Sequence, residues 1–142
     1  IMLGLSIPGS SFLARAYSGQ PAQLLELTLA ALKHNAEGRG MSYLEVVSPC
    51  VTYNDTYRDW RTSVYDVDAE EGYAPTNRAA AFTRMQELRE DKRLPLGLIF
   101  KGERHALESV ALNKDFPPPA LQDIGRPDLS GICNDALQSF IR

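Results

Sequence analysis

The stretch SFLARAYSGQPAQLLELTLAALKHNAEGRGMSYLEVV, residues 11–47, decides the fold of this 142-residue chain. Its first part, Ser11 to Tyr17, alternates in character as a strand does. Residues 22–34 place apolar side chains at helical spacing, and the expected buried face is Leu24, Leu25, Leu29 and Leu32, widened by Leu27 and Ala31. Residues 41–47 form a nearly continuous apolar run, which is typical of a strand buried on both faces of a parallel sheet. Strand, helix and strand over this length predict a parallel βαβ crossover.

Local signals mark the limits of these elements. Ser18 is expected to cap the helix, and Pro21 suits its first turn. Gly38 and Gly40 end it. Pro49 stops the second strand because proline cannot donate to the ladder. Cys50 should therefore lie just beyond the carboxyl end of a parallel strand, where α/β sheets collect their ligands and cofactors.

Residues 55–142 differ in pattern, and we expect them to form a mostly helical or irregular C-terminal extension of the α/β segment 1–54. The expected elements are, in order, a helix over 55–64 carrying Tyr57, Trp60 and Val64, an irregular acidic stretch over 65–75, a helix over 77–90 capped by Thr76 with Ala81, Phe82, Met85 and Leu88 buried, a strand over 94–100, a helical turn over 105–112, extended chain at 116–119, and a last helix capped by Ser130.

Composition excludes several classes of function. The chain has 15 Lys and Arg against 18 Asp and Glu, a formal net charge of −3, and its arginines alternate with acidic residues. Nucleic-acid binding needs clustered cations, so it is not expected. No apolar stretch approaches the ~20 residues that span a bilayer, and no signal peptide is visible. We expect a cytoplasmic protein that acts away from membranes, and the apolar start at Ile1 resembles the interior of a longer chain.

The cysteines and histidines are the candidates for chemistry. Cys50, in a polar turn, can be a metal ligand, a catalytic thiolate or a small buried hydrophobe, and composition alone favours the last. A catalytic thiolate needs a base, but His34 and His105 are both expected at the surface. Cys133 is expected to pack in the last helix. Two cysteines cannot complete a four-thiolate site, so any cluster at Cys50 takes further ligands from elsewhere.

The run Ser48-Pro49-Cys50-Val51-Thr52-Tyr53-Asn54 resembles the Ser-Pro-Cys-Val-Thr-Phe/Tyr-Asn segment of the β subunits of 2-oxoacid:ferredoxin oxidoreductases. The similarity extends over roughly residues 10–105, including Phe12 to Gly19, Asp68 to Ala81 and Leu94 to Lys101. It implies the C-terminal part of a thiamine-diphosphate-binding fold. It also implies that Cys50 is the fourth ligand of a [4Fe–4S] cluster, a role for which a thiolate is the standard donor.

The family's enzymes use thiamine diphosphate, Mg²⁺ and coenzyme A to decarboxylate a 2-oxoacid oxidatively, and they pass electrons through the cluster to ferredoxin. The resemblance thus implies an α subunit and ferredoxin as partners. The family's other three cluster cysteines and its Gly-Asp-Gly segment are absent here, so the chain alone should be inactive. Which 2-oxoacid is used, the oligomeric state and the role of Cys133 stay open. The alternatives are a stand-alone α/β interaction domain and a cysteine-dependent hydrolase or transferase.

Overall fold

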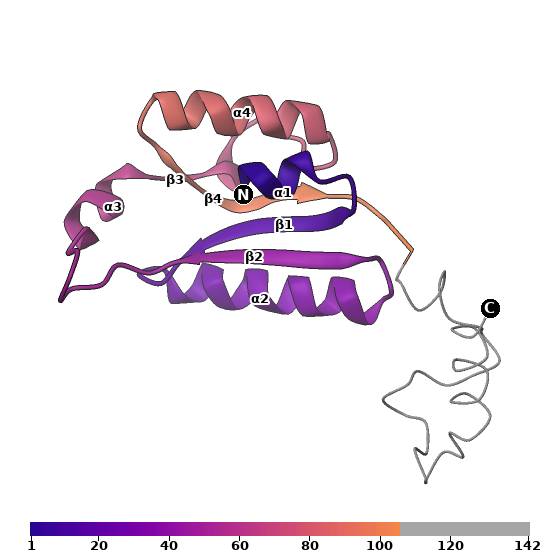
Figure 1. Ribbon diagram of the computed structural model, residues 1–142, viewed down its shortest axis with the longest axis horizontal. Helices are drawn as coiled ribbons and strands as arrows, with labels where there is room; N and C mark the ends of the chain where they lie inside the picture. The colour runs from indigo at the N-terminus through magenta and orange to yellow at the C-terminus, as the bar shows by residue number, and fades with distance from the viewer. Residues whose placement is uncertain (106–142) are drawn as a thin grey trace, which may run out of the picture.

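The computed structural model of the protein describes residues 1–105, which form an α/β structure with a four-stranded mixed sheet (Figure 1). In chain order its elements are α1 (Met2–Ser6), β1 (Ser10–Tyr17), α2 (Pro21–Ala36), β2 (Met41–Val47), α3 (Tyr57–Ser63), β3 (Val64–Asp66), the 3-10 turn η1 (Val67–Ala69), α4 (Arg78–Glu90) and β4 (Leu94–Lys101). The predicted α/β class is confirmed, and the thiamine-diphosphate-binding fold stays a proposal.

The strands of the sheet follow the order β2-β1-β4-β3. β1 and β2 are parallel, with α2 as the crossover between them, so the predicted βαβ unit is confirmed. β4 runs antiparallel to β1 and parallel to β3, which makes the sheet mixed. The predicted segments 1–54 and 55–142 therefore contribute strands to one sheet, while a domain boundary at residue 54 stays a prediction.

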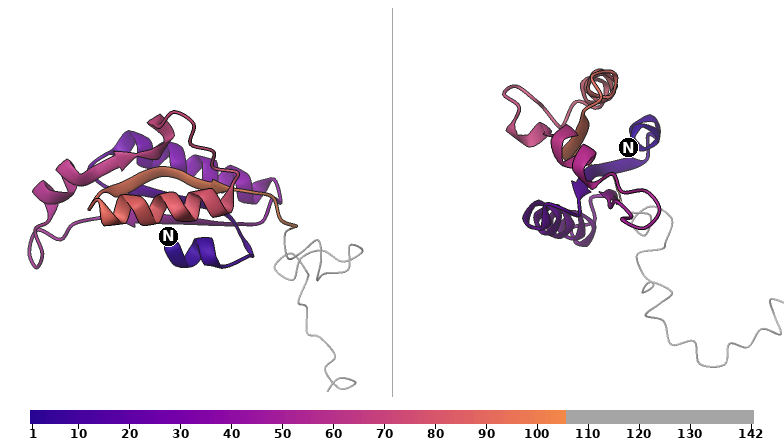
Figure 2. Two further views of the ribbon diagram at one scale, coloured as in Figure 1. Left: turned by 90° about the horizontal axis from the view of Figure 1, so that it is seen from above. Right: turned by 90° about the vertical axis from the view of Figure 1, so that its left-hand side faces the viewer.

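β1 is the centre of the structure and is buried along nearly its whole length. Because side chains alternate across a strand, β1 supplies both faces of the sheet. On one face Phe12, Ala14 and Ala16 of β1 pack against Leu27 and Ala31 of α2. On the other face Leu13 packs against α1 and α4 in a cluster with Leu5, Val67, Ala81, Met85, Leu88, Ile99 and Phe100. Figures 1 and 2 together show α2 on one side of the sheet and α1 and α4 on the other.

The predicted buried face of α2 is wrong at three leucines. Leu25, Leu29 and Leu32 are 59%, 56% and 59% exposed. The helix buries Leu27 and Ala31, which were predicted to widen the face, together with His34, which was not predicted to be buried. α2 begins with Pro21 in its first turn as predicted, but its N-cap is Gln20 with no side-chain hydrogen bond, so the predicted serine cap is also wrong.

β2 is an edge strand among the described residues, and the prediction that it is buried on both faces is wrong. Its residues alternate between exposed and half-buried, and Met41, Tyr43 and Val46 are 54%, 44% and 44% exposed. The physical reason is its place in the sheet, since α4 packs on β4 and α1 on β1, which leaves β2 with α2 as its principal helical neighbour. An apolar run alone does not report this arrangement.

The segment after residue 55 contains more strand than expected. Val64, expected on a helix, begins β3, and the stretch expected to be irregular includes β3 and η1. α4 agrees with the prediction, with Ala81, Met85 and Leu88 buried, but its N-cap is Asn77 rather than Thr76. The Asn77 side-chain oxygen accepts a hydrogen bond from the Ala80 N–H at 3.1 Å. The strand expected over 94–100 is confirmed as β4.

α1 was not expected from the sequence, and it is held in place by a residue that is distant in sequence. Arg78 of α4 donates hydrogen bonds to the carbonyl oxygens of Gly4 and Leu5 at 3.3 and 3.1 Å. The predicted helical turn over 105–112, the extended chain at 116–119 and the last helix with Cys133 lie outside the described residues, His105 excepted. Within residues 1–105, no helix is long and apolar enough to cross a membrane.

Candidate functional site

The carboxyl ends of the parallel strands β1 and β2 meet at one edge of the sheet. Tyr17 and Val47 are paired at the last register position, and the Ser18 N–H donates a 2.9 Å hydrogen bond to the Val47 carbonyl oxygen. Pro49 follows the end of β2, and Cys50 lies just beyond it. The thiol is thus presented at the edge where an open α/β sheet binds its ligands.

A tight turn carries Cys50. The Asn54 N–H donates a 2.9 Å hydrogen bond to the Cys50 carbonyl oxygen, and the two residues form an isolated antiparallel bridge. The turn between them is exposed, with Val51 69% and Tyr53 92% accessible to solvent. The Asp55 carboxylate accepts from the Tyr57 N–H at 3.2 Å at the start of α3. The loop is therefore held at both ends while its tip stays open.

The backbone of this turn favours the thiolate form of Cys50. The N–H groups of Tyr53 and Thr52 lower the pKa of the Cys50 thiol below its ordinary value, because they hydrogen-bond the charged form. Cys50 is a free cysteine with an exposed side chain. Metals and iron–sulfur clusters bind thiolates rather than thiols. The turn thus suits a ligand cysteine better than a buried hydrophobe, which was the interpretation that composition alone favoured.

Unpaired polar atoms lie near the same edge, and the sequence analysis did not identify them. In the described part of the chain, the Tyr17 hydroxyl, the Gln23 Oε1 atom and the Thr56 Oγ1 atom are buried without a hydrogen-bond partner. Tyr17 ends β1, Gln23 lies in the first turn of α2, and Thr56 is the N-cap of α3. Burial raises the pKa of Tyr17, whose ring lies 5.8 Å from that of Tyr57. No local motif distinguishes such atoms, because the neighbours that bury a side chain can be distant in sequence, as Tyr57 is from Tyr17.

Both histidines lie at the opposite edge of the sheet. The Nε2 atom of His34 is 2.9 Å from the Ser11 hydroxyl, near the start of β1, and the residue is 2% exposed. The predicted surface position of His34 is therefore wrong, whereas His105 is exposed as predicted. Ser11 to Tyr17 spans about 20 Å along β1. Within residues 1–105, neither imidazole can serve Cys50 as a base, which contradicts a cysteine-dependent hydrolase built from these residues.

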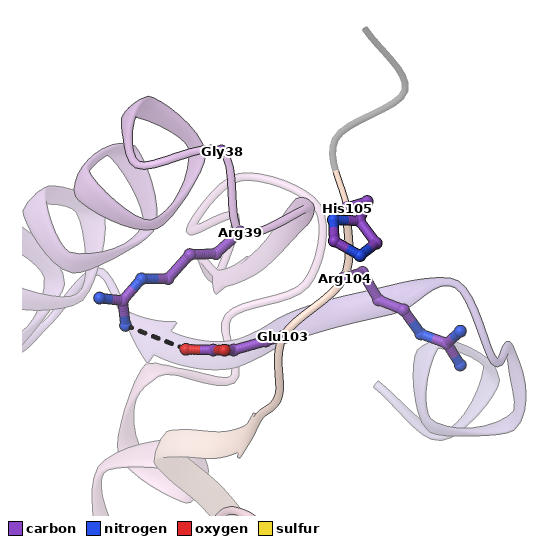
Figure 3. A pocket seen from close by; sticks show the side chains of 5 residues that line it. All are labelled: Gly38, Arg39, Glu103, Arg104 and His105. Atoms are coloured by element: carbon purple, nitrogen blue, oxygen red, sulfur yellow. Dashed lines mark ion pairs between the residues drawn. The ribbon is translucent and has the colours of Figure 1, made fainter. Parts of the chain in front are cut away.

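A pocket of about 400 Å³ lies at this opposite edge, lined by Gly38, Arg39, Glu103, Arg104 and His105. Figure 3 shows Arg39 and Glu103 extending toward each other, and their charged groups are 3.6 Å apart. Arg39 also pairs with Glu37 at 2.9 Å. The charge of Arg39 is thus compensated by two carboxylates, which reduces its ability to bind an anion in this pocket.

The metal-ligating side chains of the described residues can supply one ligand of an iron–sulfur cluster but not a complete metal site. Within residues 1–105, no group of three or more His, Cys, Asp or Glu side chains is placed to hold a metal ion. A [4Fe–4S] cluster needs four thiolates, and Mg²⁺ with a diphosphate needs carboxylate or amide oxygens in a set. Cys50 can supply one thiolate, whereas the described residues offer no set for Mg²⁺.

Comparison with known proteins finds relatives of this chain. Residues 50–113, which begin at Cys50, match the family described as the C-terminal part of the pyruvate ferredoxin oxidoreductase beta subunit. Subunit beta of 2-oxoacid:ferredoxin oxidoreductase 2 from Aeropyrum pernix is 31% identical over 140 residues, covering 85% of this chain and 43% of the relative. Subunit beta of oxidoreductase 1 from the same organism is 32% identical over 142 residues, covering 87% and 42%.

A third relative, the 2-oxoacid:ferredoxin oxidoreductase subunit beta of Saccharolobus solfataricus, is 27% identical over 110 residues, with 67% of this chain and 33% of the relative covered. The class that the fold and these matches define is that of oxidoreductase subunits. More particularly, the chain belongs to the family of 2-oxoacid:ferredoxin oxidoreductase β subunits and corresponds to their C-terminal portion. It spans less than half the length of the relatives from Aeropyrum pernix.

Proposed function

We propose that this chain provides one thiolate ligand, Cys50, to the [4Fe–4S] cluster of a thiamine-diphosphate-dependent 2-oxoacid:ferredoxin oxidoreductase. The observation that carries the proposal is the exposed thiol at the carboxyl edge of two parallel strands, with backbone N–H groups that lower its pKa. In such an enzyme the cluster would relay electrons from the oxidised substrate to ferredoxin. The residues of this chain would hold the thiolate and orient it through the turn closed by Asn54.

The complete enzyme would convert a 2-oxoacid and coenzyme A to an acyl-coenzyme A in the cytoplasm. Three cluster cysteines, the Mg²⁺ ligands and an α subunit would come from polypeptide outside residues 1–105, since the described residues hold no such sets. The chain alone would therefore be inactive. This part of the proposal is supported by the family match and by the incomplete set of metal ligands among residues 1–105.

The test replaces Cys50 in a β subunit that contains this chain and is purified anaerobically with its α subunit. Cys50→Ala should remove most of the iron, the acid-labile sulfide and the charge-transfer absorbance that a [4Fe–4S] cluster gives, because three thiolates hold it less well. Cys133→Ala is the matched control and should leave all three unchanged. A Cys50→Ala enzyme with full iron content and an unchanged cluster spectrum would refute the proposed ligand.

A stand-alone interaction domain is the second candidate function, and one observation favours it. Residues 1–105 contain hydrophobic clusters on both faces of the sheet, as an independently folded domain would. The exposed leucines of α2 count against it, because an isolated soluble domain rarely leaves a row of large apolar side chains in water. Exposed apolar surface in the purified chain, detected with a hydrophobic dye, would weigh further against this candidate.

A further inference from the structure

A second cavity, of about 270 Å³, lies at the amino end of β1, where the segment that follows β4 passes beside it. Two arginines line it, Arg78 at the start of α4 and Arg104 after the end of β4, together with the buried serines Ser10 and Ser11. A water molecule takes up about 30 Å³, so the cavity has room for a small oxyanion and several waters.

Arg78 is held in place by neutral groups. Its Nη1 atom donates hydrogen bonds to the Ile7 carbonyl oxygen at 3.1 Å and to the Ser10 hydroxyl at 3.0 Å, and its Nη2 atom donates to the Ser10 carbonyl oxygen. The guanidinium carbon lies 4.1 Å from the centre of the Phe100 ring. These contacts fix the guanidinium group, but its charge is not neutralised, because every acceptor is a carbonyl or hydroxyl oxygen.

Arg104 is positioned by its backbone. Its N–H donates a 2.9 Å hydrogen bond to the Arg39 carbonyl oxygen. Its β-carbon lies 3.0 Å from the place where Gly40, at a φ of +109°, would carry one, so the glycine permits the two segments to approach. Figure 3 shows the Arg104 side chain extending away from Arg39 and Glu103. The Glu103 carboxylate also lines the cavity, but it is 3.6 Å from Arg39.

The two arginines share the cavity without a counter-ion from the part of the chain that the structure describes. Within residues 1–105, neither Arg78 nor Arg104 forms an ion pair with a carboxylate. Burial lowers the pKa of Arg78, and the charge of Arg104 lowers it further, so the two guanidinium groups repel each other. Arginine stays protonated in proteins, and this repulsion is therefore relieved by binding an anion.

We propose that this cavity binds a phosphate group, with Arg104 as its main hydrogen-bond donor and Arg78 as a second, fixed charge. A phosphate group carries about −1.5 to −2 charges at pH 7, so one group can neutralise both arginines, whereas a carboxylate neutralises one. The planar guanidinium fork of Arg104 suits two parallel hydrogen bonds to phosphate oxygens. The site lies at the opposite edge of the sheet from Cys50, and the inference does not depend on the proposed cluster ligand.

Equilibrium dialysis of the 142-residue chain against radiolabelled inorganic phosphate at low salt tests the proposal. The chain should bind phosphate, and Arg104→Gln should weaken the affinity at least about tenfold, because it removes a charge and the paired hydrogen bonds. The matched control is Arg89→Gln, which removes the same charge from an exposed position of α4 and should bind as the wild type does. Phosphate should raise the Tm of the wild-type chain but not that of Arg104→Gln, since binding stabilises the folded state.

Glu103→Gln gives a prediction of opposite sign. It removes the carboxylate that lines the cavity, so it should tighten phosphate binding, and a weaker affinity would contradict the proposed place of the anion.

The source of the phosphate group is distinguished with phenyl phosphate. Displacement of labelled phosphate by this monoester would show that the phosphate end of a larger molecule enters the cavity, and failure to displace it would assign the site to free phosphate. A wild-type chain that binds no phosphate would overturn the proposal. The same conclusion would follow if Arg104→Gln bound phosphate as tightly as Arg89→Gln.

Discussion

The His34 side chain is enclosed at the amino end of β1. Its Nε2 atom is 2.9 Å from the Ser11 hydroxyl, which also donates a hydrogen bond to the Met41 carbonyl oxygen at 3.0 Å. Burial lowers the pKa of His34, and the nearby cations Lys101 and Arg39 lower it further. The native protein therefore holds this imidazole neutral at pH values where a solvated histidine is protonated.

The free energy of unfolding should fall as the pH drops below about 6.5, the pKa of histidine in an unfolded chain. In this window the unfolded state binds a proton that native His34 does not bind, so stability rises with pH, by at most about 1.4 kcal/mol per pH unit, and levels off above 6.5. Urea unfolding at pH 5.5 and 7.5 measures the difference. His34→Gln should be less stable at both pH values but lose less between them, and an equal or larger loss in this variant would contradict the assignment.

The prediction for Cys50 succeeded and the prediction for His34 failed for the same physical reason, which is the distance in sequence to the residue that determines each position. The position of Cys50 was predicted because Pro49, its immediate neighbour, ends the preceding strand. The burial of His34 was not predicted, since it depends on Ser11, 23 residues away in sequence. In the last turn of α2 the helix dipole favours an exposed, charged imidazole, but this local effect is outweighed by the buried hydrogen bond. Sequence reasoning is dependable where the determining neighbour is adjacent in the chain.

At the scale of elements, β4 depends on a glycine. Gly97 has a φ of +106°, and a β-carbon there would lie 2.6 Å from the Oδ2 atom of Asp68. That carboxylate cannot move away without cost, because it accepts hydrogen bonds from the Leu98 N–H at 3.0 and 3.1 Å. The pairing of β4 with β1 shifts register at the neighbouring Ala14, so the strand is irregular where the carboxylate meets it.

Gly97→Ala should lower the free energy of unfolding by about 1–3 kcal/mol, from backbone strain and from the displaced Asp68 carboxylate. Gly38→Ala is the control, because Gly38 also has a positive φ, +67°, but has open space around the added carbon. It should cost about 1 kcal/mol or less. Urea unfolding of the two variants measures both losses of free energy. Equal losses would show that the Asp68 carboxylate moves aside at no cost.

Periodicity located most elements within a few residues, yet it misassigned which face two of them bury. α2 carries leucines on more than one side, and the choice between the stripes is made by the strands beneath it. β2 is as apolar as a central strand, but strand order is a long-range property of the sheet. Both errors concern large apolar side chains that are exposed in the described part of the chain, three on α2 and three on β2.

On the scale of the whole molecule, β1 joins the two hydrophobic clusters. Leu13 lies in the cluster with α1 and α4, and its neighbours Phe12 and Ala14 lie in the cluster with α2. Loosening one face of β1 would therefore disturb the packing of the other, because a strand cannot shift for one set of side chains alone. Residues 1–105 should unfold as one unit.

One core substitution on each side of the sheet tests this coupling. Leu88→Ala in α4 and Leu27→Ala in α2 remove side chains that are 2% and 6% exposed, and each should cost about 2–5 kcal/mol. Both should lower the midpoint of a single transition, seen equally by far-ultraviolet circular dichroism and by Trp60 fluorescence. A Leu27→Ala protein that loses α2 while α4 and β4 stay folded would show two separable layers. One transition instead means that α2 belongs to the same cooperative unit that holds the Cys50 loop.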